Sequence, residues 1–188
     1  MHRLSTNFVL GFHGCRPDVA SQLLGGSDFA LSQNDYDWLG SGVYFWLSDP
    51  DRATAFVREK FAREGISDEP AVVGAIIDLS LCLDLSTIAG VQAVTDAYRG
   101  FSRTVRLANE IMPQNSGGSD LLRRHLDCAV INYLHFVREQ ASVPSIDTVR
   151  GIFQEGKAAF PNAGFREKTH TQIAVRNPDC IKGVFRPR

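Results

Sequence analysis

Three polar residues adjoin predicted strands and have side chains that can bind a polar ligand. His13 follows the apolar run at residues 8–12, Tyr44 follows the glycine loop at residues 40–42, and Gln172 lies at the start of a late strand. Imidazole, phenol and amide groups all form hydrogen bonds, so each residue is able to orient a substrate. Each also has an ordinary structural use, as a hydrogen-bonding histidine, a core tyrosine or a solvated strand glutamine. The residue types alone leave both interpretations open.

The elements that would position these residues are strands at both ends of the chain. Apolar, aromatic and β-branched runs bounded by turn residues predict strands over 8–12, 43–46, 71–79, 148–153, 171–175 and 180–185. The run at 71–79 has the length and β-branched content of a strand buried on both faces in the middle of a sheet.

Helices are predicted between these strands. Asp49 can cap a helix and Pro50 suits the first helical position, so one helix is expected to begin there. The spacing of apolar residues predicts one or two helices within 86–112, interrupted at Gly100. It also predicts the longest helix over 119–140, lying on the sheet.

The whole chain, residues 1–188, is expected to form one α+β domain with an antiparallel or mixed sheet. Its 188 residues are enough for one ordinary domain, and it shows no repeat, low-complexity tract or linker. Strands flank a helical middle instead of alternating with helices, and no Rossmann-type fingerprint is present.

Composition narrows the possible functions. The 20 Lys plus Arg residues against 21 Asp plus Glu give a formal net charge of −1, so no global basic field favours nucleic acid or an anionic membrane. The pair Arg123-Arg124 is expected to be solvated charge. Widely spaced cysteines and the lack of metal-ligand spacing predict a reducing compartment and no metal. Without a signal peptide or a membrane-length apolar run, a cytoplasmic protein is expected.

Three short motifs occur in an informative order along the chain. They are Phe12-His13-Gly14, then Gly40-Ser41-Gly42-Val43-Tyr44-Phe45, and then Gln172-Ile173-Ala174-Val175-Arg176-Asn177-Pro178. In this order and spacing the chain resembles the ADP-ribosyltransferase superfamily, in the His-Tyr-Glu branch typified by diphtheria toxin and poly(ADP-ribose) polymerases. The resemblance spans nearly the whole chain. It implies an ADP-ribosyltransferase-like split β-sandwich around an NAD cleft, with flanking helices.

The resemblance also implies a role for each site residue, with NAD as the co-substrate. His13 would hydrogen-bond a ribose hydroxyl of NAD. The backbone of Gly14 would pair with the nicotinamide carboxamide, because glycine permits a close approach. Tyr44 would flank the nicotinamide ring, and Phe56 would supply a second stacking aromatic.

The third motif holds Gln172 where this branch commonly has glutamate. Cleavage of the nicotinamide–ribose bond has an oxocarbenium-like transition state, which a nearby anion stabilises. A glutamine supplies only a hydrogen bond, so three outcomes stay open: slower transfer with a self-sufficient nucleophile, a carboxylate recruited from elsewhere, or NAD binding without catalysis. Glu155, which follows the strand over 148–153, is the candidate for the recruited carboxylate. The alternative for Glu155 is a solvated glutamate at a strand end.

The loop from residue 156 to residue 171 lies where related transferases carry the segment that helps to choose the acceptor. Its two aromatic residues, Phe160 and Phe165, would grip a target if they are exposed. An ordinary surface loop packed by its own phenylalanines is the alternative.

The expected function is cleavage of NAD and transfer of ADP-ribose to a macromolecular acceptor. By resemblance, small proteins of this kind are often bacterial toxins or effectors with a neutralising protein partner. The alternatives are an NAD glycohydrolase, a non-catalytic module that binds NAD or ADP-ribose, and an interaction protein with no nucleotide site.

Overall fold

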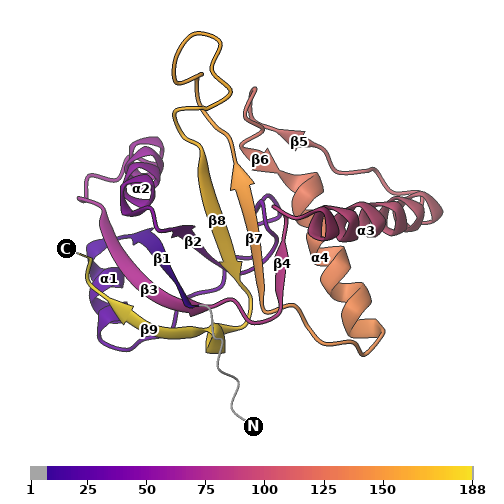
Figure 1. Ribbon diagram of the computed structural model, residues 1–188, viewed down its shortest axis with the longest axis horizontal. Helices are drawn as coiled ribbons and strands as arrows, with labels where there is room; N and C mark the ends of the chain where they lie inside the picture. The colour runs from indigo at the N-terminus through magenta and orange to yellow at the C-terminus, as the bar shows by residue number, and fades with distance from the viewer. Residues whose placement is uncertain (1–7, 188) are drawn as a thin grey trace.

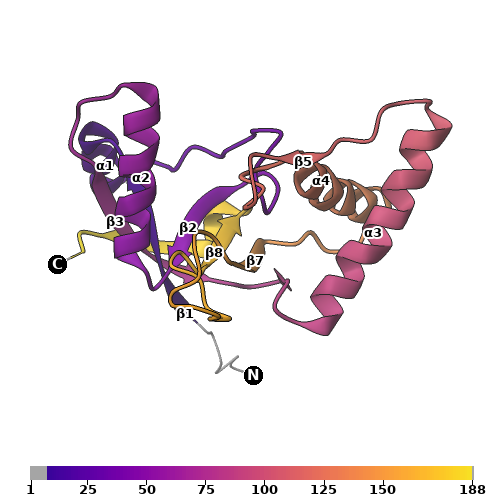
Figure 2. The same ribbon diagram turned by 90° about the horizontal axis from the view of Figure 1, so that it is seen from above.

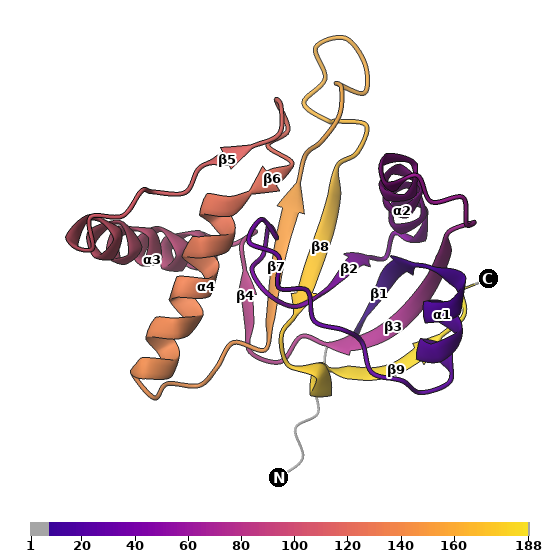
Figure 3. The same ribbon diagram turned by 180° about the vertical axis from the view of Figure 1, so that it is seen from behind.

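Seven strands form one sheet, and helices flank it in two pairs (Figure 1). The computed structural model describes residues 8–187. The strands of the sheet are β1 (Phe8–Cys15), β2 (Val43–Leu47), β3 (Ala71–Asp78), β4 (Cys82–Asp84), β7 (Thr148–Phe153), β8 (His170–Val175) and β9 (Ile181–Phe185). The helices are α1 (Pro17–Leu24), α2 (Pro50–Glu64), α3 (Ile88–Leu107), α4 (His125–Gln140) and the short 3-10 helix η1 (Pro178–Cys180). The strands β5 (Asn115–Ser116) and β6 (Arg123–Arg124) form a separate ribbon before α4, which Figure 3 shows from behind.

The sheet is mixed, with the strand order β4-β7-β8-β2-β1-β3-β9. The pair β4–β7 is parallel, and the other neighbouring strands run antiparallel. The expected α+β class with a mixed sheet is therefore confirmed. The expected place of β3 in the middle of the sheet is wrong, because only β9 lies outside it and Ile76 is exposed.

The sheet bends between β1 and β2. Only Gly11 opposite Leu47 and Phe12 opposite Trp46 are in register across this pair, whereas β1 pairs with β3 from end to end. In Figure 1, β7 and β8 run upright while β3 and β9 run across the lower part of the molecule. A Cβ atom on Gly11 would lie 2.6 Å from Ile77 Cδ1 and 2.8 Å from Phe45 Cβ. The missing side chain thus lets residues of β2 and β3 meet across β1.

The two faces of the sheet carry different helices. Residues directly opposite one another share a face, so the row Phe12, Trp46, Gln172 and Gly151 marks one face, here called the α2 face. Helix α2 covers its β1–β2 half and α4 covers its β7–β8 half, whereas α1 packs on the opposite face. Figure 2 shows α1 with α2 and α3 with α4 at opposite ends of the sheet. None of the helices in residues 8–187 has the length and apolar character needed to cross a bilayer.

Helix α2 begins as expected, because the Asp49 side chain accepts a hydrogen bond from the N–H of Arg52 at 2.8 Å. The expected interruption at Gly100 is wrong. Helix α3 runs through it, and a Cβ atom there would lie 3.1 Å from Tyr133 Cε1, so the glycine brings α3 close to α4. The helix expected over 119–140 begins only at His125, because Arg123 and Arg124 pair with β5. Helix α3, not α4, is the longer of the two.

Other boundaries also differ from the expectations. Strand β1 continues to Cys15, so His13 lies inside the strand and not at its exit. The short elements α1, β4, β5, β6 and η1 have no counterpart among the predicted elements. The expectation of no signal peptide rests partly on residues 1–7, which lie outside the described residues.

The contact across Gly11 leads to a prediction about stability. Gly11→Ala is expected to lower the free energy of unfolding by about 1–3 kcal/mol, because the added methyl group would overlap Ile77 and Phe45. Urea unfolding followed by circular dichroism measures this change. Gly164→Ala is the matched control, because no atom lies within 4 Å of its Cβ position. Equal stability of the two variants would contradict the close contact across β1.

Candidate functional site

The three motifs identified in the sequence lie on three adjacent strands. His13 and Gly14 are on β1, Tyr44 is on β2, and Gln172 is on β8, which are neighbours in the order β8-β2-β1. The sheet therefore brings these segments together from widely separated positions in the chain.

Gly14 lies at a free backbone edge of β1. The carbonyl of Leu10 accepts a hydrogen bond from the N–H of Ser48, which follows β2, at 2.9 Å. Backbone groups point to alternate sides along a strand, and the register of β1 with β3 is unbroken. The N–H and C=O of Gly14 therefore point to the same side as those of Leu10, where no residue of β2 is in register with Gly14. This edge offers one donor and one acceptor to an amide.

His13 lies beside this edge as a neutral imidazole. Its Nδ1 is 2.9 Å from the carbonyl oxygen of Tyr44, which can only accept, so Nδ1 carries the proton. Its ring packs against Phe29 and Phe45. Burial lowers the pKa of His13 below its ordinary value, although the bond to Tyr44 opposes this shift. The remaining nitrogen, Nε2, has no hydrogen-bond partner among the described residues and is not fully buried, so it can accept a hydroxyl proton.

Tyr44 anchors the preceding loop through its hydroxyl group. The hydroxyl donates to the carbonyl of Gly40 at 2.7 Å and accepts from the N–H of Leu39 at 2.8 Å. Burial raises the pKa of Tyr44 well above its usual range. Gly40 has a φ of 76°, a conformation that favours glycine, and Asn132 Oδ1 accepts from the N–H of Ser41 at 3.1 Å. The Tyr44 hydroxyl is thus committed to the loop.

Helix α2 packs directly on the strands that carry the motifs. A Cβ atom on Gly14 would lie 2.7 Å from the carbonyl oxygen of Ala53, so only glycine allows this approach. Phe56 packs against Trp46, with ring centroids 4.8 Å apart. Trp46, and not Tyr44, is directly opposite Gln172.

Gln172 is buried and bound to His170, two residues away on the same face. His170 Nδ1 is 2.6 Å from the carbonyl oxygen of Lys168, so Nδ1 is the donor and Nε2 carries the lone pair. Gln172 Nε2 then donates to His170 Nε2 at 3.2 Å. Burial lowers the pKa of His170, while the bond to the Lys168 carbonyl opposes the shift.

Glu155 is buried and paired with a cation. Its Oε2 accepts from Arg52 Nη2 at 2.8 Å, and both side chains are less than 10% exposed. The alternative of a solvated strand-end glutamate is therefore wrong. The N–H of Lys168 donates to the carbonyl of Glu155 at 3.1 Å, so Glu155 lies beside the start of β8. The pair Arg52–Glu155 and the pair His170–Gln172 are here together called the buried polar cluster. Arg52 Nε and Nη1 are buried in this cluster without a partner among the described residues.

The candidate site thus has two parts. Gln172 and Glu155 belong to the buried polar cluster with His170 between them, because Gln172 is opposite Gly151 and Glu155 lies level with Lys168. His13 lies on the opposite face from Gln172, beside Phe45. Sequence reasoning missed Arg52 and His170. The polar character of His170 within a strand, two residues before Gln172, is the signal that could have found it.

Reactive cysteines and metals receive no support from the geometry. Burial raises the pKa of Cys15, two residues from His13, to about 11, which opposes a thiolate nucleophile. Within residues 8–187, no three His, Cys, Asp or Glu side chains gather in a way that could hold a metal ion.

Comparison with known proteins gives one distant similarity. The chain is 26% identical over 191 residues to an uncharacterized protein of Methanocaldococcus jannaschii, covering 91% of this chain and 83% of that protein. No model of a known protein family matches the chain. No solved structure matches it.

The buried Arg52–Glu155 pair leads to a second prediction. Glu155→Leu is expected to lower the free energy of unfolding by about 3–5 kcal/mol, because it leaves the Arg52 charge buried and unpaired. The double variant Arg52→Leu/Glu155→Leu is expected to recover most of this loss. Urea unfolding of the two single variants and the double variant gives the coupling energy.

The control is the exposed pair Arg16–Asp68, joined at 2.8 Å. Asp68→Ala is expected to cost less than about 1 kcal/mol, because solvent screens this pair. Additive losses in the Arg52 and Glu155 variants would show that the two charges do not depend on each other.

Proposed function

We propose that this protein is an NAD-dependent ADP-ribosyltransferase, which cleaves the nicotinamide–ribose bond and transfers ADP-ribose to a macromolecular acceptor. The observation that carries the proposal is the free edge of β1 at Gly14, next to the neutral ring of His13. The resemblance of the motifs to the His-Tyr-Glu branch gives this edge its interpretation, and the adjacency of β1, β2 and β8 supports it.

The nicotinamide carboxamide has one carbonyl acceptor and an amide donor, which match the N–H and C=O of Gly14. A ring held in this way would lie in the gap where β1 and β2 diverge. His13 Nε2 would accept a hydrogen bond from a ribose hydroxyl, since its lone pair is free. Phe56, which is partly buried and packs on the buried Trp46, would provide the aromatic ring for stacking. Tyr44 would contribute its ring and an ordered loop, because its hydroxyl is already bound.

Glu155 is the proposed source of the anion that Gln172 lacks. The two residues belong to the same buried polar cluster, and Gln172 can still hydrogen-bond a sugar hydroxyl. Glu155 is neutralised by Arg52 in this structure, so catalysis requires Arg52 to find another partner. The diphosphate of NAD is such a partner, because Arg52 has two further donors, Nε and Nη1, without partners. Substrate binding would then release the carboxylate toward the reacting sugar.

The proposed acceptor is a macromolecule that contacts the loop between β7 and β8. This loop projects beyond the sheet in Figure 1. Phe160 and Phe165 are 58% and 70% exposed, so the alternative of a loop packed by its own phenylalanines is wrong. Exposed aromatic side chains are common anchors in protein recognition.

A module that binds NAD or ADP-ribose without cleaving it is the second candidate. The Arg52–Glu155 pair favours it, because the only carboxylate in the buried polar cluster is neutralised. In this case the Gly14 edge and His13 would still bind the dinucleotide, but no group would stabilise the oxocarbenium-like transition state.

Release of nicotinamide from NAD tests the proposal. The purified protein, with a cell lysate to supply acceptors, is expected to release nicotinamide, measured by chromatography. His13→Ala and Glu155→Gln are each expected to slow release by about 100-fold, because each removes a group that acts on the transition state. Gln172→Glu is expected to speed release, because it restores an anion at the third motif position.

Glu167→Gln is the matched control for Glu155→Gln, because Glu167 is an exposed carboxylate in the neighbouring loop. Circular dichroism confirms that each variant is folded. NAD binding measured by calorimetry without nicotinamide release would favour the binding module. A protein that does not bind NAD and does not release nicotinamide would contradict both candidates.

A further inference from the structure

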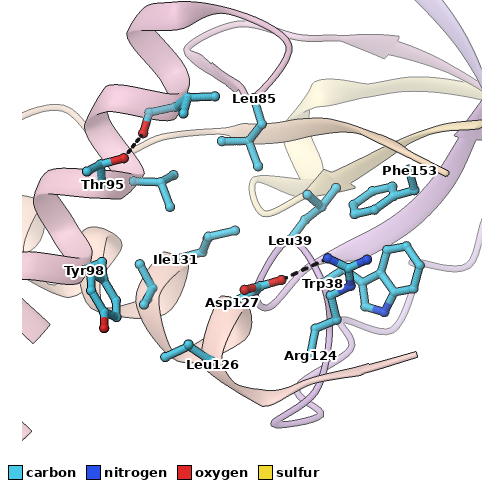
Figure 4. A pocket seen from close by; sticks show the side chains of 13 residues that line it. Trp38, Leu39, Leu85, Thr95, Tyr98, Arg124, Leu126, Asp127, Ile131 and Phe153 are labelled. Atoms are coloured by element: carbon cyan, nitrogen blue, oxygen red, sulfur yellow. Dashed lines mark hydrogen bonds and ion pairs between the residues drawn. The ribbon is translucent and has the colours of Figure 1, made fainter. Parts of the chain in front are cut away.

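A cleft of about 380 Å³ opens between α3 and α4, next to the candidate site but outside it. Helix α3 contributes Val91, Val94 and Tyr98 to its wall, and α4 contributes Asp127 and Ile131. Trp38, Arg124 and Phe153 close the end that faces the sheet (Figure 4). The volume is sufficient for a nucleobase with its sugar.

The side of α3 that faces the cleft is partly exposed. Gly90 and Ala97 are its only buried residues, and Val91 and Tyr98 on the cleft side are 52% and 43% exposed. The two helices approach closely at Gly100, which contacts Tyr133. The cleft lies beside the place where α3 and α4 approach closely. Aromatic and aliphatic side chains form most of its lining.

One end of the cleft presents a fixed planar cation. The Arg124 guanidinium lies over the Trp38 ring at 4.3 Å and within 5.6 Å of the Phe153 ring centroid. Its Nη1 donates to Asp127 Oδ2 at 3.2 Å and its Nη2 donates to the carbonyl of Asp120 at 3.3 Å. The expectation that Arg124 is solvated charge is therefore wrong. Its Nε is buried and has no partner among the described residues.

Beside this cation the cleft offers a carboxylate. Figure 4 shows Asp127 next to Arg124, between Leu126 and Leu39. Asp127 Oδ1 accepts from Asn115 Nδ2 at 2.8 Å, and each carboxylate oxygen can accept more than one hydrogen bond. By contrast, the Thr95 hydroxyl is turned toward its own helix and donates to the carbonyl of Val91 at 2.8 Å. Polar recognition is thus concentrated at Arg124 and Asp127.

We propose that the α3–α4 cleft binds a nucleobase that carries an exocyclic amino group, such as adenine or cytosine. The apolar walls suit a flat aromatic ring, and arginine guanidinium planes stack on bases. The amino group would donate to a carboxylate oxygen of Asp127, since each of these oxygens can accept a further hydrogen bond. Uracil offers Asp127 only its N3–H, which lies between two carbonyl oxygens that repel a carboxylate, so the cleft is expected to bind it more weakly. This inference concerns binding and does not depend on the cleavage of NAD.

The base can come from NAD itself or from the acceptor, because both share this chemistry. Trp38 and Phe153 line the cleft and also lie near His170 of the buried polar cluster, with ring centroids 6.4 Å and 5.8 Å apart. A base from either source would therefore be separated from the buried polar cluster by the rings of Trp38 and Phe153.

Trp38 fluorescence tests the proposal directly. The chain has two tryptophans, so in a Trp46→Phe background the signal comes from Trp38 alone, which lines the cleft. Adenosine is expected to quench it with a dissociation constant below about 1 mM, and uridine is expected to bind roughly tenfold more weakly. Asp127→Asn is expected to reduce this discrimination. Calorimetry on the unmodified protein gives the same comparison if Trp46→Phe does not fold.

A filled cleft provides the structural control. Val91→Phe is expected to abolish adenosine binding, whereas Ile88→Phe, at a residue of α3 that is 92% exposed and lies outside the cleft, is expected to leave it unchanged. Binding of adenosine that survives Val91→Phe, equal affinity for uridine, or no binding of either nucleoside would overturn the proposal. Competition by NAD identifies the dinucleotide as the source of the base, and binding unaffected by saturating NAD identifies the acceptor. Both of these outcomes support the cleft as a base site.

Discussion

The packing of Phe45 and Ile77 across Gly11 lies at the place where the sheet bends between β1 and β2. Because Gly11 has no side chain, residues of β2 and β3 pack together on the face opposite α2. The sheet bends at this place, and β1 and β2 are in register for only two residue pairs, of which Gly11 opposite Leu47 is one. Beyond them the strands diverge, and the backbone of Gly14 is left without a strand partner. The free edge of the candidate site thus lies close in the chain to this core packing.

Helix α2 connects the two parts of the candidate site. It packs against Gly14 through the backbone of Ala53, and it sends Arg52 to Glu155 beyond the end of β7. A second contact, between Lys168 Nζ and Glu59 Oε1 at 2.7 Å, ties the loop between β7 and β8 to the same helix. Because the Arg52 charge is buried, its position depends on Glu155, and any anion that competes for Arg52 would alter both the helix contact and the carboxylate.

The sequence predicted the elements whose signals are local. Asp49 and Pro50 mark the start of α2, and the β-branched runs mark β3, β7 and β8, because caps and side-chain patterns act within a few residues. It did not predict that β1 continues through His13, since pairing with β3 maintains the strand past the apolar run. The short elements α1 and β4 were missed for a related reason: packing and pairing with distant residues stabilise them more than their own sequence does.

The sequence predicted which strands carry the residues of the candidate site, but not how their side chains lie relative to one another. The motifs placed His13, Tyr44 and Gln172 at or in three predicted strands, and the structure shows that these strands are neighbours in the sheet. The face on which each side chain lies depends on register, and a shift of one residue reverses it. The burial of Glu155 and Arg124 was likewise unpredictable, because each is fixed by a partner that tertiary folding supplies: Arg52 for Glu155, and Trp38 with Asp127 for Arg124.

Tyr44 connects the candidate site to the α3–α4 cleft through the hydrogen bonds of its backbone carbonyl and its hydroxyl. Its backbone carbonyl binds His13, and its hydroxyl holds Leu39 and Gly40. The loop fixed in this way carries Trp38 and Leu39, which line the cleft. A displacement of Tyr44 would therefore act on both the His13 ring and the aromatic wall that Arg124 covers. Tyr44, proposed to flank the nicotinamide ring, is thus also the residue whose hydrogen bonds connect the two proposed sites.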